Sequence, residues 1–556
     1  MSCGIFSIMA QEYENLRNIS TLLAKEPEEL NEEEVEQFTG LLKRRILINE
    51  ASREDLLVCG LFTNYQVASL LDYRGRCGFC QSFMELASLD GFGKEFVNSI
   101  LPFVSLEHYD ELSCRADNEL TSRVSLRTTS ENIRYGYAAR YKFSLGDVLQ
   151  TSLACTRSLD TDSSIPDAVC CGIEARFRRL PLRVVAGDFN ARFGQGLALW
   201  TGSDFTSLNT PSSFMKRHYG VTPSSSFTGN YALTGLATVL TLKKISMSTC
   251  VAVPGIKTIK SAPQKLYLQP ILNLNYQWRF GQAGMSHIIE FGGLDTEFYI
   301  PTMKTSCDVS MCIHGIDLFS ELMYDWVSQR PSGVVGVVLP IKECWSCAAL
   351  LRSHAMEHKL ALSSSLNKKR LTGSLSAEMT LYSIAKDRTQ DQSAQLKLHS
   401  QWNCELSQQL HLAVRVSERI RSWGHRFRTD LRSDLLWKSN EFLATLRLNA
   451  LQCDKYSFLS YVEGGYKLDI FTIYLRQGVF FVDDWDDRIY AYERDVPGTY
   501  NSPAFYGRGV WTSLMSSWKL SDWCRIYFRA GFTTYPFMKE KKPGKAELRF
   551  QSVFDF

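Results

Sequence analysis

The chain has no long apolar stretch. The longest, residues 333–341, is about half of the roughly 20 residues that a membrane-spanning helix requires. A helical membrane protein is therefore excluded, although 45% of the residues are hydrophobic. The apolar residues are spread along the chain, as in a large core or in a band of side chains that faces lipid.

Positive charge is scarce in the first part of the chain. Residues 1–106 hold 9 Lys and Arg against 16 Asp and Glu, whereas the whole chain has a net charge of +3. The chain thus joins an acidic head to a mildly basic remainder. An acidic head opposes binding to nucleic acid, because phosphates attract positive charge.

The N-terminus lacks the basic region and the full apolar core of a complete secretory signal. Residues 1–10, MSCGIFSIMA, nevertheless end in small residues before the polar Gln11 and Glu12. We interpret residues 1–10 as the remnant of a signal peptide whose true start lies upstream; an ordinary cytosolic start is the alternative. The 16 cysteines follow no regular framework, so disulfide pairing cannot be read from the sequence.

What the chain does contain is alternation of apolar and polar residues from Ile133 onward. In residues 133–143, aromatic and aliphatic residues at odd positions alternate with residues such as Arg134 and Lys142. The same period recurs in residues 268–280 and in residues 410–417 and 525–532. Strict alternation indicates strands with one apolar and one polar face. Polar faces rich in Arg, Lys, Gln and Asn suit a water-filled lumen.

These features predict an all-β transmembrane antiparallel barrel over residues 133–556. A closed barrel leaves no unpaired sheet edge in lipid. At about 26 residues per strand with its loop, this length predicts about 14–18 strands, and even numbers are the rule. The last strand ends in Phe554 and Phe556, which resembles the signal that the barrel-assembly machinery recognises in outer-membrane barrels. That machinery and outer-membrane lipid are the expected partners.

The residues before the barrel follow a helical pattern. We expect a charged helical segment at residues 11–45, two helical hairpins at residues 46–106 and a connector at residues 107–132. Ser52 is a plausible N-cap of the first hairpin. The apolar positions expected to form the core of the hairpins are Leu56, Val67, Leu70, Leu71, Tyr73, Leu86, Leu89, Phe92, Val97, Ile100 and Leu101.

Residues 46–106 resemble the tandem helix-hairpin-helix domain of competence-type DNA-binding proteins. In that family a Gly-x-Gly turn lets backbone N–H groups approach a DNA phosphate at a helix N-terminus. The second hairpin keeps this pattern at Gly91 and Gly93, with Lys94 as the nearest cation, whereas Leu61 and Thr63 replace the glycines of the first. The resemblance implies a DNA-backbone site at Gly91, Gly93 and Lys94. Residues 46–106 carry 4 Lys and Arg against 7 Asp and Glu, which disfavours DNA.

From about residue 46 to its end, the chain resembles bacteroidete outer-membrane proteins that carry such a domain at their N-terminus. The resemblance rests on the two hairpins, on GDFNARFGQGL at residues 187–197 and on FVDDWDDRIYAYE at residues 481–493. It implies a bacterial outer-membrane barrel with the helical domain in the periplasm. We expect that domain to dock a periplasmic protein partner or to serve a structural role. The alternative is a DNA-uptake component.

No catalytic residue, metal or cofactor is expected. Gly187-Asp188-Phe189-Asn190 matches a motif of metal-dependent endonucleases and phosphatases, but the Ser-Asp-His that those enzymes require is absent from the chain. We interpret the motif as a strand interrupted by glycine at a bend of the barrel. The dense acidic cluster in residues 483–493 is expected to lie in a solvated loop or in the lumen rather than to hold a cation.

Overall fold

The computed structural model describes residues 32–43, 45–107, 116–129, 132–146, 148–161, 164–177, 180–202, 208–217, 219–227, 232–253, 268–292, 299–342, 344–383, 393–424, 427–499, 501–538 and 542–556. The predicted signal-peptide remnant at residues 1–10 lies outside these ranges, as does most of the predicted helical segment at residues 11–45.

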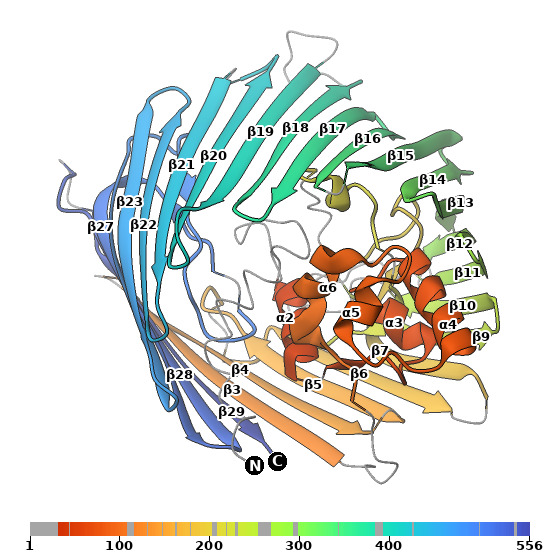
Figure 1. Ribbon diagram of the computed structural model, residues 1–556. Coiled ribbons are helices and arrows are strands. Elements are labelled where there is room, and N and C mark those ends of the chain that lie inside the picture. Colours follow the sequence, from red (N-terminus) through yellow and green to blue (C-terminus); the bar gives the residue numbers. More distant parts are fainter. Residues whose placement is uncertain are drawn as a thin grey trace.

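A small helical unit, residues 32–107, precedes the barrel (Figure 1). Its helices are α2 (Glu32–Lys43), α3 (Arg53–Val58), α4 (Asn64–Cys77), α5 (Phe83–Ala87) and α6 (Gly93–Ile100), and the short helix η2 (Leu101–Phe103) follows α6. Strands β1 (Ile46–Leu47) and β2 (Val104–Ser105) pair in parallel and bring the two ends of the hairpins together. None of the helices in the described ranges is long and apolar enough to cross a membrane.

The local sequence explains how these helices begin. Ser52 caps α3 as predicted: its side chain accepts from the backbone N–H of Asp55, and the Asp55 carboxylate accepts from the backbone of Ser52. Thr63 and Gln66 form the same reciprocal arrangement at the start of α4. The predicted apolar positions lie in or against one core, whose buried members include Leu56, Val67, Leu70, Leu86, Phe92, Val97 and Ile100.

The barrel strands follow in chain order. They are β3 (Ala116–Thr129), β4 (Ile133–Leu145), β5 (Leu149–Arg157), β6 (Ala168–Phe177), β7 (Leu182–Arg192), β8 (Gly220–Pro223), β9 (Leu233–Leu242), β10 (Ile245–Val253), β11 (Gln269–Trp278), β12 (Gly281–Gly292), β13 (Tyr299–Ile313), β14 (Ile316–Asp325), β15 (Arg330–Lys342), β16 (Trp345–His354), β17 (Glu357–Lys368), β18 (Leu371–Tyr382), β19 (Ser393–Glu405), β20 (Leu410–Arg421), β21 (Phe427–Lys438), β22 (Phe442–Gln452), β23 (Tyr456–Lys467), β24 (Phe471–Val482), β27 (Gly507–Ser521), β28 (Cys524–Thr534) and β29 (Lys545–Asp555). A short helix, η3 (Pro211–Ser213), precedes β8, and a small hairpin, β25 (Ile489–Tyr490) with β26 (Ala504–Phe505), lies between β24 and β27.

The strands close into one antiparallel barrel, as predicted. Pairing of β29 with β3 joins the two ends of the sheet, and β24 pairs directly with β27. Strand β7 pairs with β9, whereas β8 pairs only with the end of β7. The wall therefore contains 24 strands, with β8 as an addition.

The predicted number of strands, about 14–18, was wrong. Successive strands are joined at one end of the barrel by turns as short as residues 243–244 and 314–315, so each strand uses fewer residues than expected. The first strand, β3, also lies inside the range predicted to be a connector, residues 107–132. Its alternation was missed because Ser and Thr occupy many of its positions.

The two faces of the wall differ as predicted. On β11 the side chains of Leu272, Leu274 and Tyr276 are exposed on the outer face, whereas Asn273 and Gln277 are buried on the inner face. A closed barrel with an apolar outer band satisfies every backbone group within lipid and is a transmembrane barrel.

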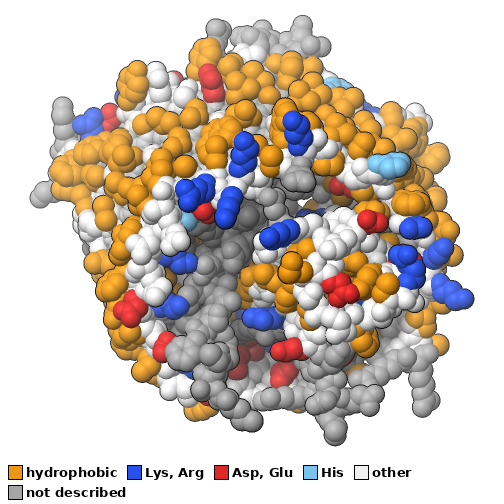
Figure 2. Space-filling view, viewed as in Figure 1, with side chains coloured by type: hydrophobic (Ala, Val, Ile, Leu, Met, Phe, Trp, Pro, Cys, Tyr) orange, Lys and Arg blue, Asp and Glu red, His pale blue; other side chains and the backbone are white. Residues whose placement is uncertain are grey.

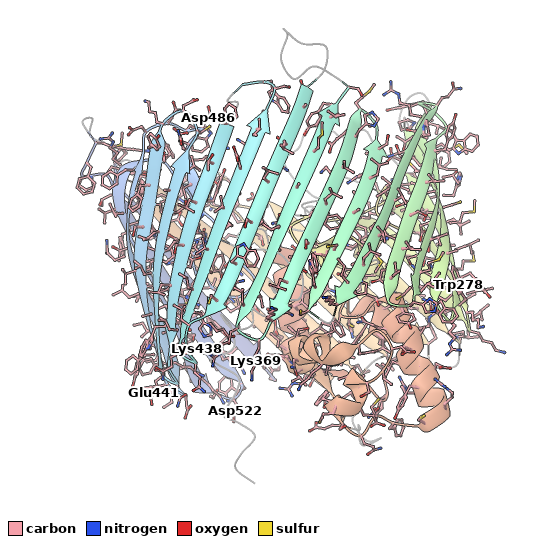
Figure 3. All side chains as sticks on the ribbon, turned by 45° about the horizontal axis from the view of Figure 1, so that its top comes forward. Trp278, Lys369, Lys438, Glu441, Asp486 and Asp522 are labelled. Carbon is pink, nitrogen blue, oxygen red and sulfur yellow. The ribbon has the colours of Figure 1, made fainter. Side chains whose placement is uncertain are left out.

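The two ends of the barrel are unlike each other. Trp278, Lys369, Lys438 and Asp522 mark one end, where strands are joined by short turns, and Asp486 marks the other (Figure 3). We call these the short-turn end and the long-loop end. The helical unit lies at the short-turn end, across part of the opening near β5 to β10 (Figure 1).

Candidate functional site in the lumen and at the short-turn mouth

Strand β7 bends into the lumen at Gly187. This glycine has φ +88°, and a Cβ placed on it would lie 2.0 Å from the carbonyl oxygen of Cys171. The Asp188 carboxylate stabilises the bend by accepting from the Cys171 N–H at 2.9 Å and from the Thr234 hydroxyl at 2.6 Å. Beyond it, Phe189 to Arg192 pair with β8. The GDFN motif is therefore a structural bend, as predicted.

After the bend, residues 193–232 form a segment that we call the first lumen segment. Its described residues pack against the inner wall. Glu321 on β14 accepts from the backbone N–H groups of Gln195 at 2.7 Å and Leu197 at 3.0 Å. Leu197 and Phe214 are buried against Phe319 and neighbouring apolar residues of β14 to β17. Side chains of the wall thus hold this segment inside the barrel.

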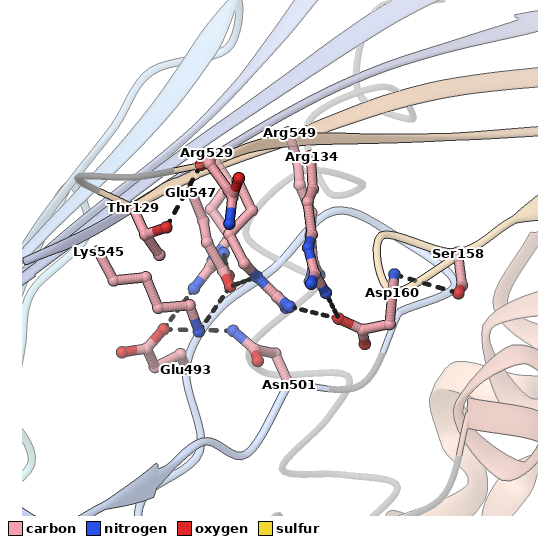
Figure 4. Close-up of polar contacts among 12 residues, drawn as sticks. Thr129, Arg134, Ser158, Asp160, Glu493, Asn501, Arg529, Lys545, Glu547 and Arg549 are labelled. Carbon is pink, nitrogen blue, oxygen red and sulfur yellow. Dashed lines mark hydrogen bonds and ion pairs between the residues drawn. The ribbon is translucent and has the colours of Figure 1, made fainter. Parts of the chain in front are cut away.

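Residues 483–506, between β24 and β27, form a second lumen segment. Arg529 on β28 is its main anchor: it binds Glu493, and it lies 3.4 Å from a carboxylate oxygen of Glu547 (Figure 4). The Arg529 side chain is 3% exposed. Glu463 on β23 binds Arg494 of the segment at 2.7 Å. Buried ion pairs therefore fix this segment against the wall.

The acidic cluster predicted in residues 483–493 does not converge. Asp483 pairs with Arg508, and Asp487 accepts from backbone N–H groups of the β22–β23 turn. Glu493 alone reaches the Arg529 anchor. Within the described ranges, no group of three or more His, Cys, Asp or Glu is arranged to hold a metal ion.

The two lumen segments meet at Phe227. The guanidinium groups of Arg123 and Arg140 each lie 4.4 Å from the centre of its ring. Arg123 also donates to the carbonyl oxygens of Pro497 at 3.0 Å and Gly498 at 3.2 Å. This contact joins both segments to β3 and β4, so the lumen is narrowed along this side of the wall.

The first lumen segment also holds the helical unit. Arg217 donates to the carbonyl oxygens of Gly60 at 3.1 Å and Leu61 at 3.0 Å, in the turn between α3 and α4. The Tyr219 ring packs against Gly60, where a Cβ would lie 2.5 Å from ring atom Cε1. The turn of the first hairpin is therefore occupied by the chain's own barrel.

Two further contacts tie α3 to the short-turn end. Asp55 pairs with Arg176 of β6, and Arg53 donates to the carbonyl oxygen of Lys243 at 2.9 Å. Burial raises the pKa of the Asp55 carboxyl, but the charge of Arg176 and the hydrogen bonds from Ser52 outweigh this effect, so the pKa lies below its ordinary value. Asp55 is thus held in its charged form.

The predicted DNA-backbone residues Gly91, Gly93 and Lys94 lie together at the start of α6 and are exposed. Gln66 donates to the carbonyl oxygen of Gly91 at 2.7 Å. Thr63, which replaces a glycine of the pattern in the first hairpin, caps α4. Sequence reasoning missed Arg217 and its neighbours, because nothing in their pattern indicates that a loop 150 residues away reaches the hairpin.

Figure 2 shows several Lys and Arg side chains on the helical unit and on the wall that faces it. The described parts of the lumen segments narrow the barrel.

No protein-family model and no curated protein matches the chain. Among solved structures it is similar to the siderophore receptor PirA from Pseudomonas aeruginosa, with 9% identity, a TM-score of 0.41 and 82% of each chain covered. It is similar to the ferripyoverdine receptor of the outer membrane of Pseudomonas aeruginosa, with 7% identity, a TM-score of 0.38 and coverage of 79% of this chain and 72% of that one. It is also similar to the P pilus usher (PapC) translocation pore, with 8% identity, a TM-score of 0.37 and coverage of 79% and 99%. The strand pairing by itself assigns the closed barrel.

Proposed function

We propose that the chain is a non-enzymatic outer-membrane barrel whose helical unit lies in the periplasm and partly covers the mouth. The contacts of Arg217 and Tyr219 with Gly60 carry this proposal. They join the helical unit to a segment that is itself packed inside the lumen. The unit therefore acts as a docking module toward its own barrel.

The shape of the barrel supports this orientation. Outer-membrane barrels have short turns on the periplasmic side and longer loops outside. Here the helical unit contacts the short-turn end, and the last strand, β29, also finishes there. The side chain of Phe556 is exposed, which supports the proposal that the barrel-assembly machinery recognises the last strand.

A periplasmic protein partner would need exposed apolar surface on the helical unit. Met84 on α5 is 80% exposed, and Phe79, in the link between the hairpins, is 49% exposed. Both are large apolar side chains on a small acidic unit. They are the part of the helical unit best suited to a second docking contact.

DNA capture is the second candidate function. The exposure of Gly91, Gly93 and Lys94 at the start of α6 favours it, since a helix N-terminus binds phosphate. The first hairpin cannot assist, because Arg217 already occupies its turn. The adjacent Asp90 and the acidic surface of the unit oppose DNA, so we favour docking.

The proposal is tested with the full-length precursor, given a complete leader, in a Gram-negative host. We expect recovery in the outer membrane, with migration on a gel that changes on heating. In planar bilayers, the double variant Arg217→Gln, Tyr219→Ala should show larger or more frequent conductance than the parent, because the covering unit is released.

The matched control is Arg508→Gln, which removes an arginine from an exposed ion pair at the long-loop end. It should leave conductance unchanged. Recovery of the precursor as a soluble monomer would contradict the outer-membrane assignment. Identical conductance of the parent and the double variant would contradict the covering role.

A further inference from the structure

The inner face of β19, β20 and β21 carries more basic than acidic side chains, with Lys397 on β19 and arginines on β20 and β21. Along β20, Arg415, Arg419 and Arg421 face the lumen, whereas Val416 on the opposite face is exposed on the outside of the barrel. None of these three arginines is fixed to a lumen segment by a contact in the described part of the chain. These three arginines therefore differ from Arg529 and Arg123, which anchor the lumen segments.

Strand register brings like charges directly opposite one another. Arg419 is paired with Lys397 of β19 on one side and with Arg428 of β21 on the other. Arg415 is likewise paired with Arg432. Like charges at directly opposed positions of a sheet are destabilising. The sequence thus maintains an arrangement that costs stability.

Lys397, Arg415, Arg419 and Arg428 form a row of basic side chains on this face. Nearby carboxylates do not neutralise the row. Glu378 lies 3.3 Å from Lys359 and 3.2 Å from Lys397, so two lysines share it. Asp434 is shared in the same way between Arg432 and Arg447.

The arginines at the centre of the row are left short of partners. The nearest carboxylate oxygen to Arg415 belongs to Asp430, at 3.6 Å. Arg428 donates to the backbone carbonyl oxygens of Asp486 at 2.7 Å and Arg488 at 2.9 Å in the second lumen segment, and both acceptors are neutral. Arg419 has no ion pair among the described residues.

Some hydrogen-bond donors of the row also have no acceptor. The Nε atoms of Arg415 and Arg419 are buried and have no hydrogen-bond partner within the described structure. A buried donor without a partner is costly, and native proteins rarely keep one without a reason. Both donors lie in the row that already has excess positive charge.

We propose that the lumen face of β19 to β21, centred on Arg419 with Lys397, Arg415 and Arg428, binds a small polyvalent oxyanion. Guanidinium groups match phosphate and carboxylate oxygens in geometry and charge. A bound oxyanion would neutralise the opposed cations and supply acceptors for the buried Nε–H groups. The site goes beyond the proposed function and does not depend on whether the helical unit covers the mouth.

The test is isothermal titration of the folded full-length protein in detergent, at physiological ionic strength. One arm uses sodium tripolyphosphate and the other uses sodium citrate. We expect saturable binding of at least one anion, and the arm that responds distinguishes phosphate from carboxylate recognition. The double variant Arg415→Gln, Arg419→Gln should bind at least tenfold more weakly.

Two further variants separate a specific site from general charge. Arg508→Gln removes one positive charge from an exposed pair elsewhere and should bind as the parent does. Arg419→Lys keeps the charge and should bind the anion more tightly than Arg419→Gln does. This difference would show that the weaker binding of Arg419→Gln is not a folding defect alone. Absence of binding of both anions, or equal affinity of the parent and the double variant, would overturn the proposal.

Discussion

The Tyr219 ring lies against Gly60, so that the first hairpin of the helical unit touches a segment that is otherwise packed inside the barrel. Gly60 has φ +72°, a conformation that L side chains rarely adopt, and the ring fills the space where its side chain would be. A single close contact therefore couples the helical unit to the lumen.

This contact predicts that Gly60→Ala releases the helical unit. The new Cβ would meet the Tyr219 ring, and the positive φ adds about 1–2 kcal/mol of backbone strain. The measurement is hydroxyl-radical footprinting of Tyr219 in the folded full-length protein, where modification should increase. Gly93→Ala is the control: Gly93 also has a positive φ, but a Cβ there meets nothing within 4 Å. Equal protection of Tyr219 in both variants would contradict the coupling.

Acid should weaken the same docking. Because the pKa of Asp55 is lowered from 3.8, its pair with Arg176 contributes fully above that value and is lost as pH falls through the lowered one. Protection of Tyr219 should stay constant from neutral pH to about pH 5 and decrease only below about pH 4.

Asp55→Asn provides the control for this pH dependence. It should reduce protection of Tyr219 already at neutral pH, because the charge of Asp55 is missing at every pH. The remaining decrease below about pH 4 should then be smaller than in the parent. A decrease of the same size in both proteins would show that another carboxylate is responsible.

Removal of Arg529 should release the second lumen segment. Arg529→Met leaves the buried carboxylate of Glu493 without its main partner, a change that typically costs about 3–5 kcal/mol. Trypsin should then cut the segment at Arg488 or Arg494, which lie within it. Arg508→Met, which breaks an exposed pair, should leave the cleavage rate close to that of the parent. A parent-like rate for Arg529→Met would show that the ion pairs do not hold the segment.

The sequence alone predicted the class of fold because alternation is a local property of each strand. Leu272 and Asn273 already show which face meets lipid and which meets the lumen. Ser52 was likewise recognisable as a cap, since its partner Asp55 lies only three residues away. The number of strands was not predictable in this way, because it depends on how short the turns at one end are.

The contacts that position the helical unit could not be predicted, because they join residues far apart in the chain. Arg217 and Gly60 are separated by more than 150 residues, and no periodicity connects them. The row around Arg419 is similar: Lys397 and Arg428 become its neighbours only through strand register. Each arginine by itself resembles any other residue of a wet lumen.

Weak binding of DNA is the outcome expected for the helical unit. Its first hairpin turn is occupied by Arg217 and Tyr219, which leaves Gly91, Gly93 and Lys94 at the start of α6 as the only part of the predicted phosphate pattern in the described structure that is still exposed. One such turn on an acidic unit forms few phosphate contacts, so affinity for duplex DNA should lie in the non-specific range, roughly 10⁻⁴–10⁻⁶ M, and should fall steeply with salt.

The measurement is fluorescence anisotropy of labelled duplex titrated with the full-length protein in detergent. The parent is compared with Gly93→Val and with Gly78→Val, which changes a glycine of positive φ outside both hairpin turns. Sub-micromolar binding at physiological salt that Gly93→Val removes and Gly78→Val preserves would make DNA capture the leading function. Weak binding that neither substitution changes would leave the helical unit as a docking element of its own barrel.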